Sequence, residues 1–488
     1  MKTGELSISD SAWIIASVIV AAVVGYLYVN AASLGLKPTI ALGLFVSFVI
    51  GCMLFVKDLK LFLIFAMVLS IWTGLAYHLT LRAMPPLQSR PFEEGIALTS
   101  VVFILPLLFF QWLFAASSMT TRRWPTIGNP LGTLLLAWIL YTFISSRLTA
   151  VDFEFSLFEI AVLLQGFVLF FYLANNLETL RDIRVTVYAL LAGALAQAVY
   201  MEMQYVTGLN YTLRGAFVTQ RDAIFRPAGF FADEVLSSQM IAMIVPLVLT
   251  WYFTSSRRIM RVMAVVSMLV LLAGLLAGQH RASWGAVAVS FVIIAAIAEA
   301  RKWVKPRTIF KSFVVATILA ILASPVIIHR FERGTWGEDR IALAATALEI
   351  FKEHWLFGVG ASNYSYYIEK NIPVELRYTW HALVHSEYLL HLVQGGIIGA
   401  LLYYLLMGIM CIKLWRLIRS PEPWISSVSA GIFAAVISSL LMRVLNTFHL
   451  PPSYLLTCVL LALTVSMENL ERKRLNEETK GTVPAVIP

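Results

Sequence analysis

Residues 260–300 read MRVMAVVSMLVLLAGLLAGQHRASWGAVAVSFVIIAAIAEA, and they contain two long apolar runs, 260–278 and 282–299. Each run is long enough to cross a hydrocarbon core of roughly 30 Å as a helix. Inside lipid, every backbone N–H and C=O must be paired within its own segment, so such runs can only be helical. The stretch therefore predicts a helical hairpin that crosses a membrane twice and turns tightly at Arg281.

The same pattern recurs along the whole chain. Of the 488 residues, 59% are hydrophobic and only 13% are charged, whereas soluble domains carry roughly a quarter charged residues. We expect an all-α, polytopic integral membrane protein with about fourteen spans, the first one retained, forming a single membrane domain over residues 1–488. The predicted spans are 12–29, 39–56, 59–78, 96–116, 131–145, 155–174, 182–205, 235–253, 260–278, 282–299, 310–328, 393–415, 424–445 and 453–467.

The distribution of basic residues predicts the orientation of these spans. With both termini in the cytoplasm, most of the 37 Lys and Arg residues fall in cytoplasmic loops and tails, as the positive-inside rule requires. Topology therefore explains the net charge of +9 better than a nucleic-acid partner does. Two long segments, 206–234 and 329–392, then lie outside, and we expect the function there.

The longer outside segment contains a predicted surface helix. Apolar residues recur there at helical spacing and predict a helix that lies along the membrane surface and is ended by Gly358. Farther on, Ser386 could cap the helix that becomes the next span. The apolar face of the surface helix would consist of Ile341, Ala344, Ala345, Leu348 and Phe351.

Arginine dominates the basic residues of the predicted outside face. Its planar fork of donors suits phosphate and pyrophosphate oxygens, although each arginine could also be solvated or paired with a nearby acid. Arg281 lies at the mouth of the helix bundle, where a charge is unfavourable in free energy unless it is paired or hydrated. It could also be an arginine at a span end whose side chain snorkels to the interface. The outside arginines are Arg82, Arg90, Arg147, Arg214, Arg221, Arg226, Arg281, Arg330, Arg333, Arg340, Arg377 and Arg443.

His385 is the candidate general base. It precedes a predicted helix start, with Glu387 two residues later and His381 four residues earlier, and an imidazole can accept a proton from a sugar hydroxyl at neutral pH. A loop histidine can also simply be exposed. His381 and His385 could form half a metal site, but no third-ligand pattern accompanies them, so we predict no metal and no cofactor.

Four motifs in order resemble the bacterial O-antigen ligase and polymerase superfamily: FRPAGFF, HRASWGA, DRIALAATALEIFKEHWLFGVGASNY and HSEYLLHLVQGGIIG. The resemblance covers roughly residues 200–410, including the large loop 329–392, and points to an O-antigen ligase-like region with a GT-C-like fold. It implies a metal-independent membrane glycosyltransferase of the bacterial inner membrane, with its active site on the periplasmic face. Such an enzyme moves a glycan from undecaprenyl pyrophosphate to a lipid, glycan or protein acceptor, in lipopolysaccharide or exopolysaccharide synthesis.

By position, the resemblance assigns roles to individual residues. His385 and Arg281 would be catalytic, and Gly358 and Gly360 would shape the loop. Gln279 and His280 stand where the family has small residues, and Ser386 stands where asparagine is common, which leaves acceptor preference open. The donor pyrophosphate would be held by Arg226, Arg281 and Arg340, and also by Arg214 and Arg221.

Two alternatives accompany the ligase interpretation, which the signature favours narrowly. A polymerase would use the same donor and lengthen a lipid-linked chain. A transporter of a small anion such as bicarbonate, known among relatives, could line its pathway with Gln165, Gln197, Glu202 and Gln204. Aromatic residues of the outer loop could stack on acceptor sugars or form an interfacial belt; they are Tyr364, Tyr366, Tyr367, Tyr378 and Trp380.

Overall fold

The computed structural model describes residues 58–79, 95–117, 129–209, 225–231, 233–332, 338–371, 384–447 and 450–481. The chain divides into two compact units: residues 1–67 with 103–125, and residues 68–102 with 126–488. The candidate site lies in the second unit. The predicted spans 12–29 and 39–56 lie outside the described residues, and the division into a single membrane domain stays a prediction.

Ten helices of the described chain are long and apolar enough to cross a membrane, and each coincides with a predicted span. The chain is therefore confirmed as a polytopic, mainly α-helical membrane protein. The ten are α5 (Pro130–Thr149), α6 (Phe153–Asn176), α7 (Leu180–Thr207), α8 (Glu234–Thr254), α9 (Arg258–Gly278), α10 (Arg281–Ala300), α11 (Pro306–Glu332), α14 (Glu387–Leu417), α15 (Pro423–Leu445) and α16 (Pro451–Gly481).

Two other predicted spans differ from the structure. The helix expected over 59–78 ends at Ser70 as α3 (Leu59–Ser70), and a short 3₁₀ turn leads to strand β1 (Ala76–Leu79). The helix expected over 96–116 starts later, as α4 (Ser100–Ser117), after strand β2 (Ile96–Thr99). The two strands pair antiparallel. The Gln165 side chain of α6 accepts a hydrogen bond from Thr99 N (3.0 Å) and donates one to Ala97 O (2.7 Å), so a distant polar side chain supports the strand.

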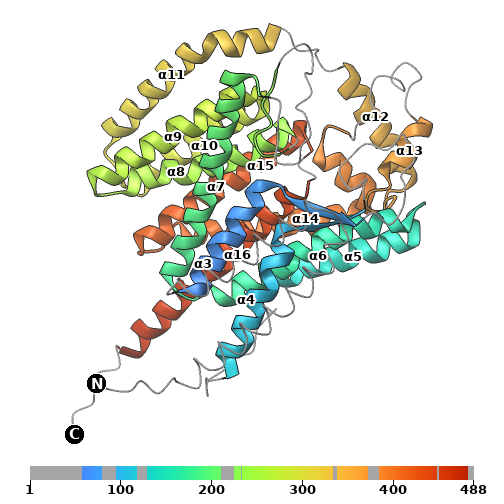
Figure 1. Ribbon diagram of the computed structural model, residues 1–488, viewed down its shortest axis with the longest axis horizontal. Coiled ribbons are helices and arrows are strands. Elements are labelled where there is room, and N and C mark those ends of the chain that lie inside the picture. The colour runs from blue at the N-terminus through green and yellow to red at the C-terminus, as the bar shows by residue number, and fades with distance from the viewer. Residues whose placement is uncertain are drawn as a thin grey trace, which may run out of the picture. The chain divides into compact units, whose positions relative to one another are not determined.

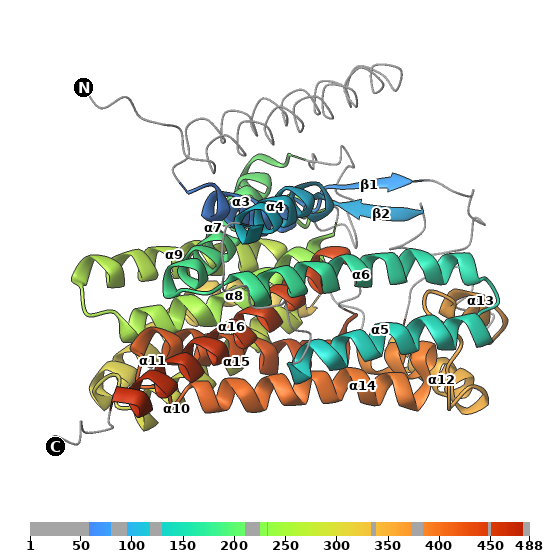
Figure 2. The same cartoon turned by 90° about the horizontal axis from the view of Figure 1, so that it is seen from below.

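Helices α8 and α16 supply much of the core of the second unit. Most of α8 is buried, and it packs against α7, α9, α10 and α15, while α16 packs against α6 and α14 packs against α5 and α15. In Figure 2, α5, α6 and α14 run side by side, with α12 and α13 at one end. By the predicted topology this is the end away from the cytoplasm, and it is called the predicted outer end below.

The helix predicted in the longer outside segment is present as α12 (Glu338–Glu353), and the short α13 (Tyr364–Asn371) follows it. Both pack against α14 (Figure 1). Leu343, Ala347 and Ile350 of α12 are buried in the protein, whereas Ile341 and Leu348 of the predicted apolar face are exposed, so the contact of that face with the membrane surface stays a prediction. Apolar residues occupy both stripes, and only packing against α13 and α14 decides which one is covered.

Candidate functional site

A break in α14 organises the predicted outer end. Gly396 interrupts the helix with φ 61° and ψ −170°, and the segment after α12 runs past the break. Val359 N donates to Val393 O (2.9 Å), and Ile397 N donates to Trp355 O (2.8 Å). The passing segment therefore satisfies backbone groups that the break would otherwise leave unpaired in an apolar environment.

Two glycines permit this close backbone approach. Gly358 and Gly396 both have left-handed φ values, 74° and 61°. A Cβ added at Gly358 would lie 2.4 Å from Gln394 O, and one at Gly396 would lie 2.3 Å from Leu356 O. Gly360, with φ 89°, approaches Ala150 in the same way. Gly358 of the Gly-x-Gly motif and Gly396 of the Gly-Gly motif thus meet at a backbone contact that a side chain at either position would block.

The residues after Gly360 are clamped by α5 and α6. Ala361 N donates to Ser146 Oγ (2.9 Å), and Ser156 Oγ donates to Ala361 O (2.7 Å). Asn363 bonds both the N–H and the C=O of Asp152, so its side chain joins the loop to the start of α6. The loop is buried, and Val359 and Tyr364 at its two ends pack in one cluster with Val384, just before α14.

His385 lies at the start of α14. Val384, just before it, is buried in a cluster with Ala347, Ile350 and Val393, while His385 itself is partly exposed. Ser386 is the N-cap residue, as predicted, but its side chain makes no capping hydrogen bond. The chain is therefore packed in the core at Val384, directly before His385.

Arg281 and Arg340 come together at the same end. Arg281 opens α10, directly after a turn in which Gln279 adopts φ 51°, and its guanidinium carbon lies 5.3 Å from the centroid of the Phe331 ring. Arg340 Nη1 donates to Leu445 O (3.3 Å). Partial burial, and then the positive charge of Arg281, lower the pKa of Arg340. Ser283, two residues after Arg281, also contacts α15, at Met442, so both arginines belong to elements that meet the same turns of α15, and an anion bound by both would reduce the repulsion between their charges.

Arg226 lies in the segment just before α8 and contacts the first residue of that helix. Its Nη1 lies 3.6 Å from Glu234 Oε1, and the residue is 9% exposed. The backbone that follows it is clamped by two glutamines of α7: Gln204 Oε1 accepts from Gly229 N (2.8 Å), and Gln197 Oε1 accepts from Phe230 N (3.0 Å). The structure brings Arg281 and Arg340 together and places Arg226 with Glu234, whereas Arg214 and Arg221 lie outside the described residues.

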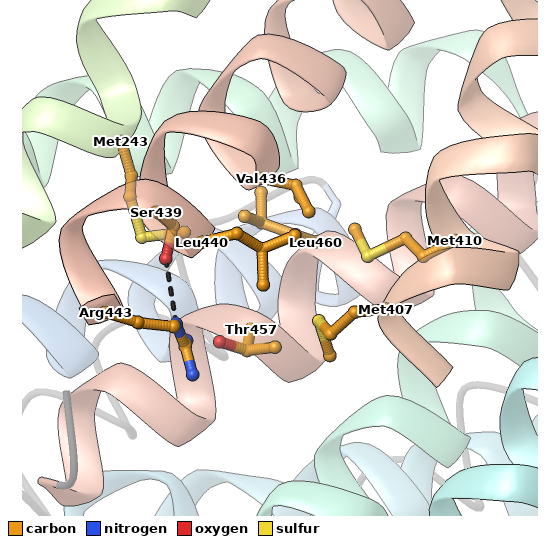
Figure 3. A pocket seen from close by; sticks show the side chains of 9 residues that line it. All are labelled: Met243, Met407, Met410, Val436, Ser439, Leu440, Arg443, Thr457 and Leu460. Atoms are coloured by element: carbon orange, nitrogen blue, oxygen red, sulfur yellow. Dashed lines mark hydrogen bonds between the residues drawn. The ribbon is translucent and has the colours of Figure 1, made fainter. Parts of the chain in front are cut away.

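A buried ionic cluster that the sequence did not predict joins α14 and α15 at this end. Arg443 contacts both Glu387 and the Tyr403 hydroxyl, and His391 Nε2 lies 3.3 Å from Glu387 Oε1. Arg443 Nε also donates to Ser439 Oγ (3.1 Å), at the edge of a small cavity lined mainly by methionine and leucine side chains (Figure 3). Charges inside apolar runs were the available signal, but the sequence does not show which of them pair.

No three His, Cys, Asp or Glu side chains within the described ranges gather as metal ligands would. His381, the proposed partner of His385 in a metal site, lies outside those ranges. The groups that the structure does place together at the predicted outer end are guanidinium, imidazole and carboxylate groups.

The fold and these residues define a polytopic membrane protein with a broken helix and a cationic site at one end of its spans. Residues 242–404 match the model of the O-antigen ligase family. The matched range contains Arg281, Arg340, Gly358, Gly360 and His385, whereas Arg226 and Arg443 lie beyond it. The matched region, which runs from α8 to α14, is similar to an O-antigen ligase domain. A comparison with curated proteins gives no match.

Proposed function

We propose that this protein transfers a glycan from undecaprenyl pyrophosphate to an acceptor hydroxyl, at the membrane face away from the cytoplasm of a bacterial inner membrane. The observation that carries the proposal is that α10 and α12 bring the neighbourhoods of Arg281 and Arg340 against the same end of α15, through Ser283–Met442 and Arg340–Leu445, within the region that matches the O-antigen ligase family. Two guanidinium groups at a membrane surface suit a lipid-linked pyrophosphate, which carries two negative charges and accepts bidentate hydrogen bonds.

In the proposed reaction, the bond between the anomeric carbon and the pyrophosphate oxygen breaks, and the electron pair leaves with the pyrophosphate. Arg281 and Arg340 stabilise the charge that develops on this leaving group. His385 accepts the proton of the acceptor hydroxyl, whose oxygen forms the new glycosidic bond. The polyprenyl chain stays in the lipid while the glycan faces water.

The transporter alternative is weaker because the three glutamines among its four candidate polar groups already bind the protein backbone. Gln165 supports β2, and Gln197 and Gln204 bind the backbone of residues 228–230. Side chains that hold buried backbone in this way stabilise the fold. They are poorly suited to line a transport pathway.

A reconstituted assay tests the proposal and separates ligase from polymerase. Purified protein in lipid nanodiscs receives undecaprenyl-pyrophosphate-linked repeat units, with or without a distinct acceptor lipid or glycan. We expect transfer only after the distinct acceptor is added. A ladder of longer lipid-linked chains without that acceptor would identify a polymerase, and no turnover with any acceptor would refute the proposed function.

A further inference from the structure

The last turns of α15 contact three helices of the proposed site: α10, α12 and α14. Ser283 of α10, two residues after Arg281, places its Oγ 3.6 Å from Met442 Sδ. Arg340 of α12 donates to Leu445 O (3.3 Å), and Tyr388 of α14 donates its hydroxyl to Leu440 O (3.0 Å). Residues 440–445 therefore link the arginine side of the site to the histidine side.

The strongest of these links is the Glu387–Arg443 ion pair. Glu387 is fully buried and Arg443 is 4% exposed, and their charged groups are in direct contact. Arg443 also contacts the Tyr403 hydroxyl and donates to Ser439 Oγ (Figure 3), and His391 lies 3.3 Å from Glu387. The aromatic side chains of Trp138, Tyr404 and Tyr454 complete the surroundings. Removing two charges from water costs free energy, and a hydrophobic pair of similar volume often gives the folded protein equal or greater stability.

The break at Gly396 gives the pair a mechanical role. Residues 387–395 form a half-helix that is not continuous with the rest of α14, because Gly396 leaves the helical conformation. Contacts with neighbouring helices must therefore set the direction of this half-helix. Glu387 is its first residue, two positions after His385, so an anchor at Glu387 acts close to the imidazole.

We propose that Glu387 and Arg443 are positioning residues for glycan transfer, which hold His385 at a fixed place relative to Arg281 and Arg340. The inference rests on the proposed function. The pair touches neither substrate nor reacting atoms. It acts through the start of α14 on one side and through the end of α15 on the other.

Kinetics in nanodiscs test the pair with three variants: Glu387→Gln, Arg443→Gln and the double variant. We expect kcat to fall about a hundredfold in each, because a misplacement of about 1 Å can cost that much. The KM for the lipid-linked donor should stay within about twofold of wild type, since the arginines remain. The double variant buries no lone charge, so it should fold normally and still be slow.

The Lys413–Glu468 pair is the matched control. It also joins α14 to a neighbouring helix, α16, with Nζ and Oε2 2.5 Å apart, but it lies far along α14 from His385. Lys413→Gln and Glu468→Gln should keep wild-type kcat. Wild-type kcat in Glu387→Gln or in the double variant would overturn the proposal. So would a loss of activity that only follows the loss of folded protein in thermal unfolding.

A second measurement does not depend on activity. Spin labels are placed at Ala345, which is exposed on α12, and at His385, after the native cysteines have been replaced by serine. Pulsed electron resonance should show a broadened distance distribution in Glu387→Gln and an unchanged one in Lys413→Gln. An unchanged distribution in Glu387→Gln would refute positioning. If wild-type protein transfers no glycan at all, the proposed function fails, and this distance measurement still decides whether the pair fixes the start of α14.

Discussion

Arg281 allows charge and shape to be tested separately. Arg281→Lys keeps the positive charge at the start of α10 but loses the planar fork that binds two oxygens at once. We expect glycan transfer to fall by about 10²–10³-fold, the usual effect of losing one donor that stabilises developing charge, with normal protein abundance. Transfer in nanodiscs, normalised to protein, measures this.

Arg301 provides the control for Arg281. It lies at the other end of α10, where its Nη2 donates to Ser420 O (3.3 Å), so Arg301→Lys should leave transfer unchanged. Equal activity in Arg281→Lys and wild type would reduce Arg281 to a residue that only marks the end of a span.

His385 is predicted to accept the acceptor proton. His385→Ala should lower kcat by about 10²–10⁴-fold, the usual contribution of general base catalysis, while the lipid-linked donor still binds through the arginines. Donor binding is measured by the quenching of a fluorescent lipid-linked analogue. Retained turnover in His385→Ala would assign the proton to another group.

A variant of His391, in α14 six residues after His385, distinguishes an effect on protein stability from an effect on the reaction. It is 6% exposed and lies against Glu387 and Tyr403, so His391→Ala removes a buried partner of the ion pair. We expect a loss of stability of about 1–3 kcal/mol and much less effect on transfer than His385→Ala. Equal losses in the two variants would indicate loop collapse or a metal site, and a chelator would distinguish these.

At the scale of elements, the break in α14 depends on glycine. Gly396→Ala places a Cβ 2.3 Å from Leu356 O at φ 61°, and a strained backbone position of this kind costs about 1–3 kcal/mol. We expect a lower unfolding temperature and disturbed contacts between residues 355–360 and α14. Thermal unfolding in nanodiscs measures the effect.

The same helix offers a matched glycine. A Cβ at Gly408 would meet nothing within 4 Å, and alanine is favoured over glycine in a helix interior by about 1 kcal/mol. Gly408→Ala should therefore be neutral or stabilising. If both variants behaved alike, the close approach at Gly396 would not contribute to the fold.

At the scale of the whole molecule, the orientation predicted from the basic residues can be tested by labelling. With the native cysteines replaced by serine, Glu349→Cys on α12 should react with a membrane-impermeant thiol reagent in intact cells. Lys305→Cys, in the basic loop before α11, should react only after the cells are permeabilised, because Lys- and Arg-rich loops resist translocation. The reverse pattern would place the candidate site in the cytoplasm.

Local hydrophobicity was enough to locate the ten described spans, since the length and apolarity of each run are properties of the run itself. The residue types of the site, arginine, histidine and paired glycines, were also readable in the sequence. Tertiary packing alone decided that α12 buries Leu343 rather than Ile341, that 59–78 turns into a strand at Ala76, and that Glu387 pairs with Arg443. Each of these depends on a partner distant in sequence: α12 on α14, β1 on β2, and Glu387 on a residue 56 positions away. Apolar periodicity specifies which side chains avoid water, but in a membrane protein many surfaces are apolar, so the pattern cannot say which of them meets another helix and which meets lipid.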